Sequence, residues 1–224
     1  DAVGLRPEDS FWNLADPGWA YGIYFGITGP LSMGHPITFY DGPFTVESTC
    51  RVIKKLGITN LTGSPTAYRM LIAAGDAFSS KIKGQLRVVS SAGEPLNPEV
   101  IRWFADELGV TIHDHYGQTE VGMVLCNHHG LEHAVHMGAA GFASPGHRIV
   151  VLDDNHQELP VGQPGILAVD RSQSPMCWFG GYEGFPTKAF VGNYYLSGDT
   201  VELNPDGSIS FVGRSDDVIT TSGY

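Results

Sequence analysis

The stretch from Leu86 to Glu120 reads LRVVSSAGEPLNPEVIRWFADELGVTIHDHYGQTE, and it determines the expected fold. An apolar run over residues 86–89 predicts a strand, and a run of small residues follows it. Asn97 followed by Pro98 is typical of a helix start, and Gly109 ends that helix. A second apolar run, 110–112, predicts another strand. Strand, loop, helix and strand in this order indicate two parallel strands joined by a right-handed crossover.

The same alternation occurs upstream. Thr45 is expected to cap a helix over residues 46–56, and a short strand over 58–61 and a helix from Pro65 to Gly75 follow it. Before them we expect a polar, turn-like segment to residue 16, a buried glycine-rich helix over 19–31 and a short strand over 36–40. Residues 1–134 are therefore predicted to be an α/β unit with a parallel sheet and flanking helices.

The pattern changes from about residue 135. Short apolar runs follow at 149–152, 166–169, 200–203 and 208–212, and the turn signal Asn204-Pro205-Asp206-Gly207 separates the last two. This spacing is typical of antiparallel hairpins. We expect a smaller, mostly antiparallel β subdomain over 135–215, shaped as a distorted barrel, and then a hinge over 216–224.

Composition excludes several classes of protein. The 224 residues carry a formal net charge of −11, so the surface as a whole will not attract nucleic acid or anionic lipid. Three widely spaced cysteines are typical of reduced thiols in a cytosolic protein. The uncharged run over 18–34 is too short and glycine-rich for a membrane span. We therefore expect a cytoplasmic protein; the sequence does not set its oligomeric state.

Polar side chains follow several of the predicted parallel strands. The carboxyl ends of such strands share one edge, so we expect the loops 62–65, 91–95 and 113–120 to line one crevice. Tyr116 offers a flat face for stacking, and Gly117 lets the backbone approach a ligand. Thr119 supplies a hydroxyl, and Glu120 supplies a carboxylate suited to a hard cation such as Mg²⁺. Taken alone, the stretch is equally compatible with an ordinary polar turn.

Two clusters in the second half carry similar chemistry. Ser197-Gly198-Asp199 presents a carboxylate in a tight turn, an arrangement that suits the two hydroxyls of a ribose. Residues 213–217 place Arg214 before two acidic residues. For each cluster alone, a solvated turn is the simpler interpretation.

Together and in this order, these motifs resemble the AMP-forming acyl-CoA synthetases of the acyl-adenylate-forming superfamily. That superfamily includes acetyl- and medium-chain acyl-CoA synthetases, luciferase and peptide-synthetase adenylation domains. The matching segments are Trp19 with its neighbours, 91–95, 116–120, 195–199, and 213–217 with 222–224. The resemblance implies that a carboxylate attacks the α-phosphate of ATP to give acyl-AMP and pyrophosphate, and that coenzyme A then displaces AMP. The protein would position the groups and stabilise the developing charge.

The resemblance also implies roles for individual residues. Tyr116 would stack on adenine, Asp199 would bind the ribose, and Thr119 and Glu120 would form the catalytic pair, with Thr119 at phosphate and Glu120 at Mg²⁺. Asp216 matches the family's hinge. The implied nucleotide site comprises Gly93, Glu94, Pro95, Asp114, His115, Tyr116, Gly117, Gln118, Thr119, Asp199 and Arg214.

The implied acyl pocket comprises Trp19, Ala20, Tyr21, Ala92 and Gly117. In acetate-using members of the family a tryptophan blocks the pocket floor at the position of Gly117. Its absence is expected to leave room for several methylenes, each favouring binding by roughly 0.8 kcal/mol. The sequence therefore favours a medium-chain or aryl acid over acetate.

Parts of the family's machinery are not in this sequence. The phosphate loop with its lysine is expected before Asp1, and the small domain with the catalytic lysine after Tyr224. Between Asp114 and Asp199 the basic residues are Arg148, Arg171 and Lys188, which is few for a triphosphate. We therefore expect the 224-residue chain alone to show no ATP–pyrophosphate exchange.

Three alternatives remain at this point. One is an adenylation domain or luciferase-like member with a different acceptor, and another is a non-catalytic nucleotide-binding module. The third is a zinc site, because six histidines lie near Cys126: His113, His115, His128, His129, His133 and His136. No HExxH or CxxC spacing occurs, so most are interpreted as loop or core histidines.

Overall fold

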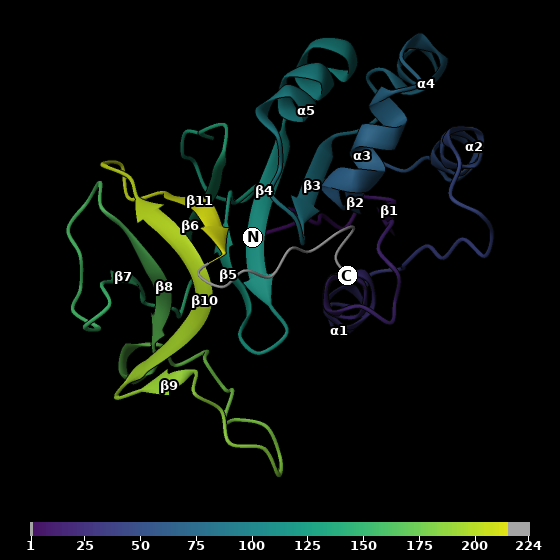
Figure 1. Ribbon diagram of the computed structural model, residues 1–224. Coiled ribbons are helices and arrows are strands. Elements are labelled where there is room, and N and C mark those ends of the chain that lie inside the picture. The colour runs from purple at the N-terminus through teal and green to yellow at the C-terminus, as the bar shows by residue number, and fades with distance from the viewer. Residues whose placement is uncertain (1, 215–224) are drawn as a thin grey trace.

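The computed structural model describes residues 2–214, and their strands form one 11-stranded sheet (Figure 1). The strands are β1 (Phe11–Asn13), β2 (Asn60–Gly63), β3 (Val88–Ala92), β4 (Ile112–Gln118), β5 (Gly122–Cys126), β6 (Ala139–Ala143), β7 (Ile149–Leu152), β8 (Pro164–Asp170), β9 (Phe190–Val191), β10 (Tyr194–Leu203) and β11 (Ile209–Arg214). Their order is β1-β2-β3-β4-β5-β6-β11-β10-β8-β7, and β9 pairs with β10.

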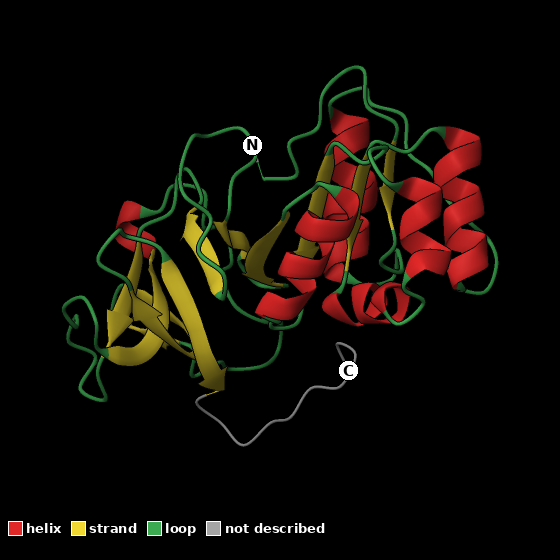
Figure 2. Ribbon diagram, turned by 90° about the horizontal axis from the view of Figure 1, so that it is seen from above, coloured by secondary structure: helices red, strands yellow, loops and turns green. Residues whose placement is uncertain are grey.

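The helices lie mostly on one half of this sheet. They are η1 (Gly22–Thr28), α1 (Gly29–Ser32), α2 (Val46–Leu56), α3 (Pro65–Ile72), α4 (Asp76–Ile82), α5 (Pro98–Trp103), η2 (Phe104–Leu108) and η3 (Arg171–Gln173). Figure 2 shows all but η3 around the half that contains β1 to β4. Within the described residues, no helix is long and apolar enough to cross a membrane.

The predicted fold class is confirmed. Strands β1 to β4 pair in parallel, and every later pairing in the sheet is antiparallel. The capping signals also act as expected, since the Thr45 hydroxyl accepts from the Ser48 N–H at 3.0 Å and Gly57 ends α2 at φ 61°. The sheet therefore changes from parallel to antiparallel pairing at β4, where the β4–β5 hairpin begins.

The N-terminal third departs from expectation in three places. The turn-like segment contains β1, because buried Phe11 and Trp12 pair with β2 in parallel. The strand expected over 36–40 is a single bridge between Trp12 and Thr38. The helix expected over 19–31 is present over residues 20–32, but it is π-helical from Gly22 to Thr28.

The burial of this helix was also predicted incorrectly in part. Gly22 and Gly26 are buried because they lie against residues 13–16, where a Cβ would meet the Asp16 carbonyl or the Asn13 side chain. Its bulky residues Ile23, Tyr24 and Leu31 are exposed. The two glycines therefore form the buried face together with Tyr21 and Pro30.

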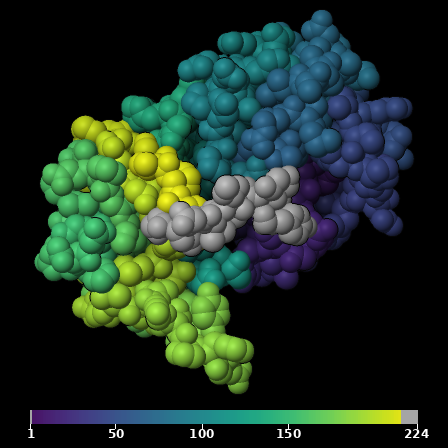
Figure 3. All heavy atoms as spheres, in the orientation of Figure 1, coloured from purple at the N-terminus to yellow at the C-terminus, as the bar shows by residue number. Residues whose placement is uncertain are grey.

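Two large apolar cores lie on either side of β4, and Val150, Leu152 and Ala168 form a smaller third cluster. One combines Ile53, Leu61, Tyr68 and Phe104 with their neighbours in the α/β half. The other, which includes Leu167, Val169 and Tyr195, lies in the antiparallel half. Figure 3 shows these halves as a purple-to-teal side and a green-to-yellow side, with the segment between η3 and β9 projecting from the latter.

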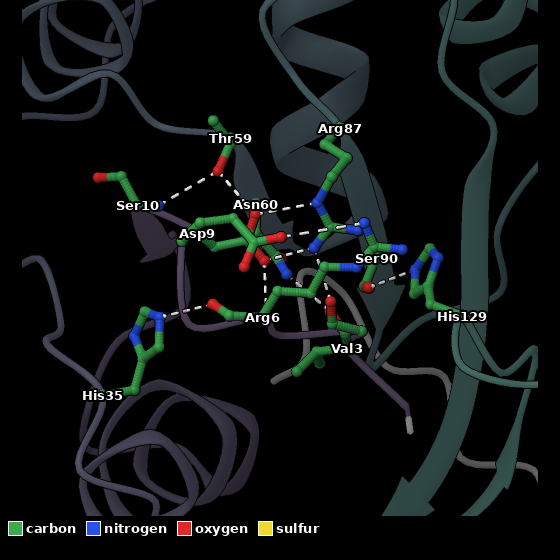
Figure 4. A network of polar contacts seen from close by, with 12 residues as sticks. Val3, Arg6, Asp9, Ser10, His35, Thr59, Asn60, Arg87, Ser90 and His129 are labelled. Atoms are coloured by element: carbon green, nitrogen blue, oxygen red, sulfur yellow. Dashed lines mark hydrogen bonds and ion pairs between the residues drawn. The ribbon is translucent and has the colours of Figure 1, made fainter.

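A polar network fixes the N-terminal segment beneath the parallel strands (Figure 4). The Asp9 carboxylate, whose side chain is 1% exposed, pairs with Arg87 and accepts from the Thr59 hydroxyl at 2.8 Å. Thr59 and Arg87 precede β2 and β3 directly, so this network lies at the amino ends of the strands. It leaves the opposite, carboxyl edge of the sheet for a ligand.

Candidate functional site

A cavity of about 560 Å³ lies at the carboxyl edge of β3 and β4. All five residues of the predicted acyl pocket line it: Trp19, Ala20, Tyr21, Ala92 and Gly117. Six residues of the predicted nucleotide and metal site also line it, and one of them, Gly117, belongs to both sets: Gly93, Gly117, Gln118, Thr119, Glu120 and Arg214. The cavity therefore contains the acyl set and part of the nucleotide set in one continuous space.

Gly93 and Trp19 fit together at one wall of this cavity. Gly93 has φ 95°, a conformation that favours glycine. A Cβ at this position would lie 2.9 Å from the Trp19 indole. The missing side chain at residue 93 therefore lets Trp19 pack directly on the backbone after β3.

The backbone requires a glycine at position 117 for a reason that the sequence alone did not reveal. The register between β4 and β5 shifts between Tyr116 and Gly117, and a Cβ on Gly117 would lie 2.4 Å from the Gly122 carbonyl oxygen. With this backbone, a side chain at 117 would therefore point at β5. A tryptophan at this position would need a rearranged β4–β5 hairpin, so the depth of the cavity does not follow simply from replacing an indole by hydrogen.

Asp199 is the centre of a hydrogen-bonded network between β4 and the β10–β11 pair. It is 4% exposed, and its Oδ2 accepts from the Tyr116 hydroxyl and, at 3.0 Å, from Gln118 Nε2. Arg214 Nη1 donates to Oδ1 at 3.2 Å. Burial and the neighbouring carboxylate raise the pKa of Tyr116 well above its ordinary value, so the phenol is a neutral donor. Four residues expected to contact nucleotide thus contact one another here.

Glu94 lies in the loop after β3, but its carboxylate turns away from the cavity towards α3. Oε2 accepts from the Thr66 hydroxyl at 2.7 Å and from Arg69 Nη2 at 3.0 Å. The Glu94 side chain is 9% exposed. Of the predicted Gly93-Glu94-Pro95 set, only Gly93 lines the cavity. The buried carboxylate instead anchors the loop to α3.

Glu120 supplies the oxygen donor that a hard cation would need. Its carboxylate lines the cavity beside Thr119, and its Oε1 accepts from the Tyr182 hydroxyl. Within residues 2–214, no group of three or more His, Cys, Asp and Glu side chains is placed to hold a metal. Mg²⁺ commonly binds one carboxylate together with substrate phosphates, and Glu120 fits that mode. The cation would then neutralise charge on the phosphates.

Asp114 and His115 lie in β4 but do not line the cavity. Burial raises the pKa of Asp114 well above its usual range and lowers the pKa of His115 to about 3. Within the described part of the chain, Asp114 Oδ1 and both ring nitrogens of His115 are buried without a hydrogen-bond partner. These groups are therefore neutral parts of the interior in this structure.

The histidines near β4 pack as rings. His113 and His129 stack with centroids 3.7 Å apart and planes 7° apart, and His115 meets His129 edge-on. Burial lowers the pKa of His129 to about 2. The packing of neutral imidazoles matches the core interpretation of these residues. The predicted hinge residue Asp216 lies outside the described residues.

Several residues of the site were not predicted from sequence. Tyr24 and Phe25 from η1 and Met123 from β5 also line the cavity, as do Tyr182 and Tyr195 from the antiparallel half. Tyr195 lies two residues before the Ser-Gly-Asp turn, within the matching segment 195–199, so its position in a strand leading to that turn was a usable signal. Tyr182 lies between η3 and β9, where no motif marks it.

A cavity at the carboxyl edge of parallel strands, with aromatic, hydroxyl and carboxylate groups around it, defines an α/β protein with a small-molecule site. The family profile described as "AMP-binding enzyme" matches residues 1–182. The chain therefore belongs to the AMP-binding enzyme family.

Known proteins agree with this assignment. The chain is 37% identical over 225 residues to an acetyl-coenzyme A synthetase of Bacillus subtilis, and 37% identical over 227 residues to the mitochondrial acyl-coenzyme A synthetase ACSM3 of Rattus norvegicus. These alignments cover 99% of this chain but 39% and 38% of the relatives. The chain thus spans about two fifths of their length.

Solved structures show the same relationship. The crystal structure of a Brucella canis acyl-CoA synthetase is 61% identical, with a TM-score of 0.93, and covers 100% of this chain and 41% of that one. A benzoate CoA ligase from Burkholderia xenovorans is 27% identical, with a TM-score of 0.82 over 97% of this chain and 44% of that chain. The fold described above is therefore the fold of the matching part of these enzymes.

Proposed function

We propose that the full-length protein containing this chain activates a carboxylic acid with ATP to acyl-AMP and pyrophosphate, and then transfers the acyl group to coenzyme A. The observation that carries this proposal is the single cavity in which the acyl-pocket set meets Gly93, Thr119, Glu120 and Arg214. An acid bound at Trp19 and Ala92 would lie next to groups suited to a phosphate and its cation. That adjacency is what in-line attack on the α-phosphate requires.

The residues divide the task by chemistry. Thr119 donates a hydroxyl hydrogen bond to phosphate, and Glu120 holds Mg²⁺ as an anionic oxygen ligand. Asp199 accepts from the ribose hydroxyls, with Arg214 at its other oxygen. Tyr116 lies at the edge of the nucleotide site, where its hydroxyl donates to Asp199. Because the substrate carboxylate is the nucleophile, none of these side chains has to form a covalent intermediate.

The acid is proposed to be medium-chain or aryl. Support comes from the walls of the cavity, since Tyr24, Phe25 and Met123 add apolar and aromatic surface to the predicted acyl pocket. A buried methylene favours binding by roughly 0.8 kcal/mol, so a six- to eight-carbon acid would bind more tightly than acetate in such a space. If acetate had the higher kcat/KM in a comparison with hexanoate, octanoate and benzoate, this choice of acid would be wrong.

The experiment is pyrophosphate release by the purified full-length protein across that panel of acids, with and without coenzyme A. We expect acid-dependent release in both cases and thioester formation only with coenzyme A. Glu120→Ala should lose at least about 100-fold in kcat because charge on the phosphates is no longer neutralised. Glu183→Ala is the matched control, since Glu183 lies next to Tyr182 but does not line the cavity.

The 224-residue chain alone is proposed to be inactive in ATP–pyrophosphate exchange. The cavity wall contains one basic residue, Arg214, among the described residues, against a triphosphate of about four negative charges. Measurable exchange by the isolated chain would contradict this proposal without affecting the proposal for the full-length protein.

A further inference from the structure

We propose that Gln118 and Tyr195 are positioning residues that aim the Asp199 carboxylate at the ribose of the nucleotide; this inference rests on the proposed function. Gln118 ends β4 and Tyr195 lies at the start of β10, so the two side chains meet across the boundary between the two halves of the sheet. Both line the cavity, although their polar atoms bond to protein groups.

The hydrogen bonds fix the Gln118 amide in one orientation. The Tyr195 hydroxyl donates to Gln118 Oε1 at 2.9 Å, so the oxygen end of the amide faces β10. The nitrogen end then donates to the Ser197 carbonyl at 2.8 Å and to Asp199 Oδ2 at 3.0 Å. If the amide were flipped, its oxygen would face two acceptors and its NH₂ would lose both bonds. The Ser197 carbonyl and the Asp199 carboxylate therefore determine which end of Gln118 faces them, and the Tyr195 hydroxyl holds the other end of the amide in place.

Asp199 needs this alignment because it is buried and flanked by a glycine. The Asp199 backbone N–H donates to the Ser197 hydroxyl at 3.1 Å, which in turn donates to the Leu167 carbonyl at 2.8 Å. Those bonds hold the backbone, while Gln118, Tyr116 and Arg214 hold the carboxylate. Gln118 and Tyr116 both donate to Oδ2, whereas Arg214 donates to Oδ1. The β4 donors thus set the plane of the carboxylate, and a change in that plane alters how it meets a pair of vicinal hydroxyls.

Burial increases the free energy that these hydrogen bonds contribute. Desolvation is the main cause that raises the pKa of Tyr195, so the hydroxyl is a neutral donor throughout the physiological range. A hydrogen bond to a buried charged group contributes more than one at the surface, because water is not there to replace it. Replacing Gln118 by an apolar residue therefore leaves Asp199 with fewer donors and a less defined orientation.

The test is the preference of the full-length enzyme for ATP over 2′-deoxy-ATP and 3′-deoxy-ATP, measured as the ratio of kcat/KM values. Gln118→Leu should lower that preference about tenfold, the size expected from one charge-assisted hydrogen bond. Tyr195→Phe should lower it by about threefold, because Gln118 keeps its bond to Asp199 but loses the bond that holds its Oε1 in place. In both variants, kcat/KM with the deoxynucleotides should fall much less than kcat/KM with ATP.

Tyr194→Phe is the matched control. Tyr194 also lies on β10, and its hydroxyl donates to a carboxylate, Glu158, at 2.9 Å, but it is outside the cavity. Its ATP preference should match the wild type. Equal losses with ATP and both deoxynucleotides in Tyr195→Phe would overturn the inference, and this variant decides alone if Gln118→Leu does not fold. A wild-type enzyme without acid-dependent pyrophosphate release would instead overturn the proposed function.

Discussion

Gly117 shows how one residue can be required by the backbone while it lines a site. A Cβ there would lie 2.4 Å from the Gly122 carbonyl and 2.8 Å from Met123 Cα. Relief of that overlap requires the β4–β5 hairpin to move. We expect Gly117→Ala to lower the free energy of unfolding by about 1–3 kcal/mol, the usual range for overpacking. Denaturant unfolding of the full-length protein measures the change.

Gly180→Ala provides the control at this scale. An ideal Cβ on Gly180 meets no atom within 4 Å. The unfolding free energy of this variant should stay within about 0.5 kcal/mol of the wild type. If the two alanine variants were equally stable, Gly117 would not be restricted by β5, and the earlier interpretation of this position as an open pocket floor would regain support.

At the scale of elements, α3 and the loop after β3 act together. Thr66 starts that contact, donating to both oxygens of Glu94 at 3.0 and 2.7 Å, and Arg69 adds an ion pair at 3.0 Å. Arg69 is half exposed, so its ion pair contributes less than the threonine bonds to a buried carboxylate. We expect Thr66→Val to weaken AMP binding by about three- to tenfold, and Arg69→Met by about twofold.

Calorimetric titration of the full-length protein with AMP measures both effects. Thr111→Val, a substitution of an exposed threonine before β4, should leave the affinity unchanged. Tighter or unchanged AMP binding by Thr66→Val would show that the position of the loop does not depend on α3.

At the scale of the whole molecule, acid is expected to destabilise the fold. Burial lowers the pKa of His115 to about 3 and of His129 to about 2, whereas histidine in an unfolded chain titrates near about 6.5. Below that pH the unfolded chain binds protons that the folded chain does not, so stability falls as the pH drops from 7 to 5. Each such histidine contributes a slope of up to about 1.4 kcal/mol per pH unit.

His129→Gln is expected to make that slope shallower by about one proton's contribution, as measured by urea unfolding at pH 7, 6 and 5. His136→Gln, at a side chain 54% exposed, should change it far less. The Asp9 carboxylate affects stability in a lower pH range than the histidines. Burial alone would raise the pKa of Asp9, but the hydrogen bonds from Arg87, the Arg6 N–H and Thr59 outweigh it, so the pKa is lowered. The stability that the ionised Asp9 carboxylate contributes to the fold is therefore lost only below about pH 4. An unchanged slope in His129→Gln would contradict the assignment of a neutral, buried ring.

The sequence predicted local features well because local signals determine them. The run from Val88 to Gln118 carries strand, cap and glycine signals within each element, and its strands pair as expected. The strand β1 was missed because three residues are too few for a periodic pattern. The contacts of Asp199 with Tyr116 and Gln118 depend on the strand order β4-β5-β6-β11-β10, which no local pattern encodes. The positions of the Glu94 and Glu120 carboxylates likewise depend on partners that are distant in the sequence, Thr66 and Tyr182.

That strand order has a consequence for how the chain is made. The bonds that join β4 to β10 connect residues 77 to 83 positions apart, whereas β10 and β11 are neighbours in the chain. Closing a loop of about 80 residues costs about 4 kcal/mol of chain entropy, so these bonds form after the local units. On the ribosome, a nascent chain that has emerged only through β9 already contains the walls around Trp19 and Gly117. It still lacks the carboxylate of Asp199, and we infer that it cannot distinguish a ribonucleotide until β10 has also emerged.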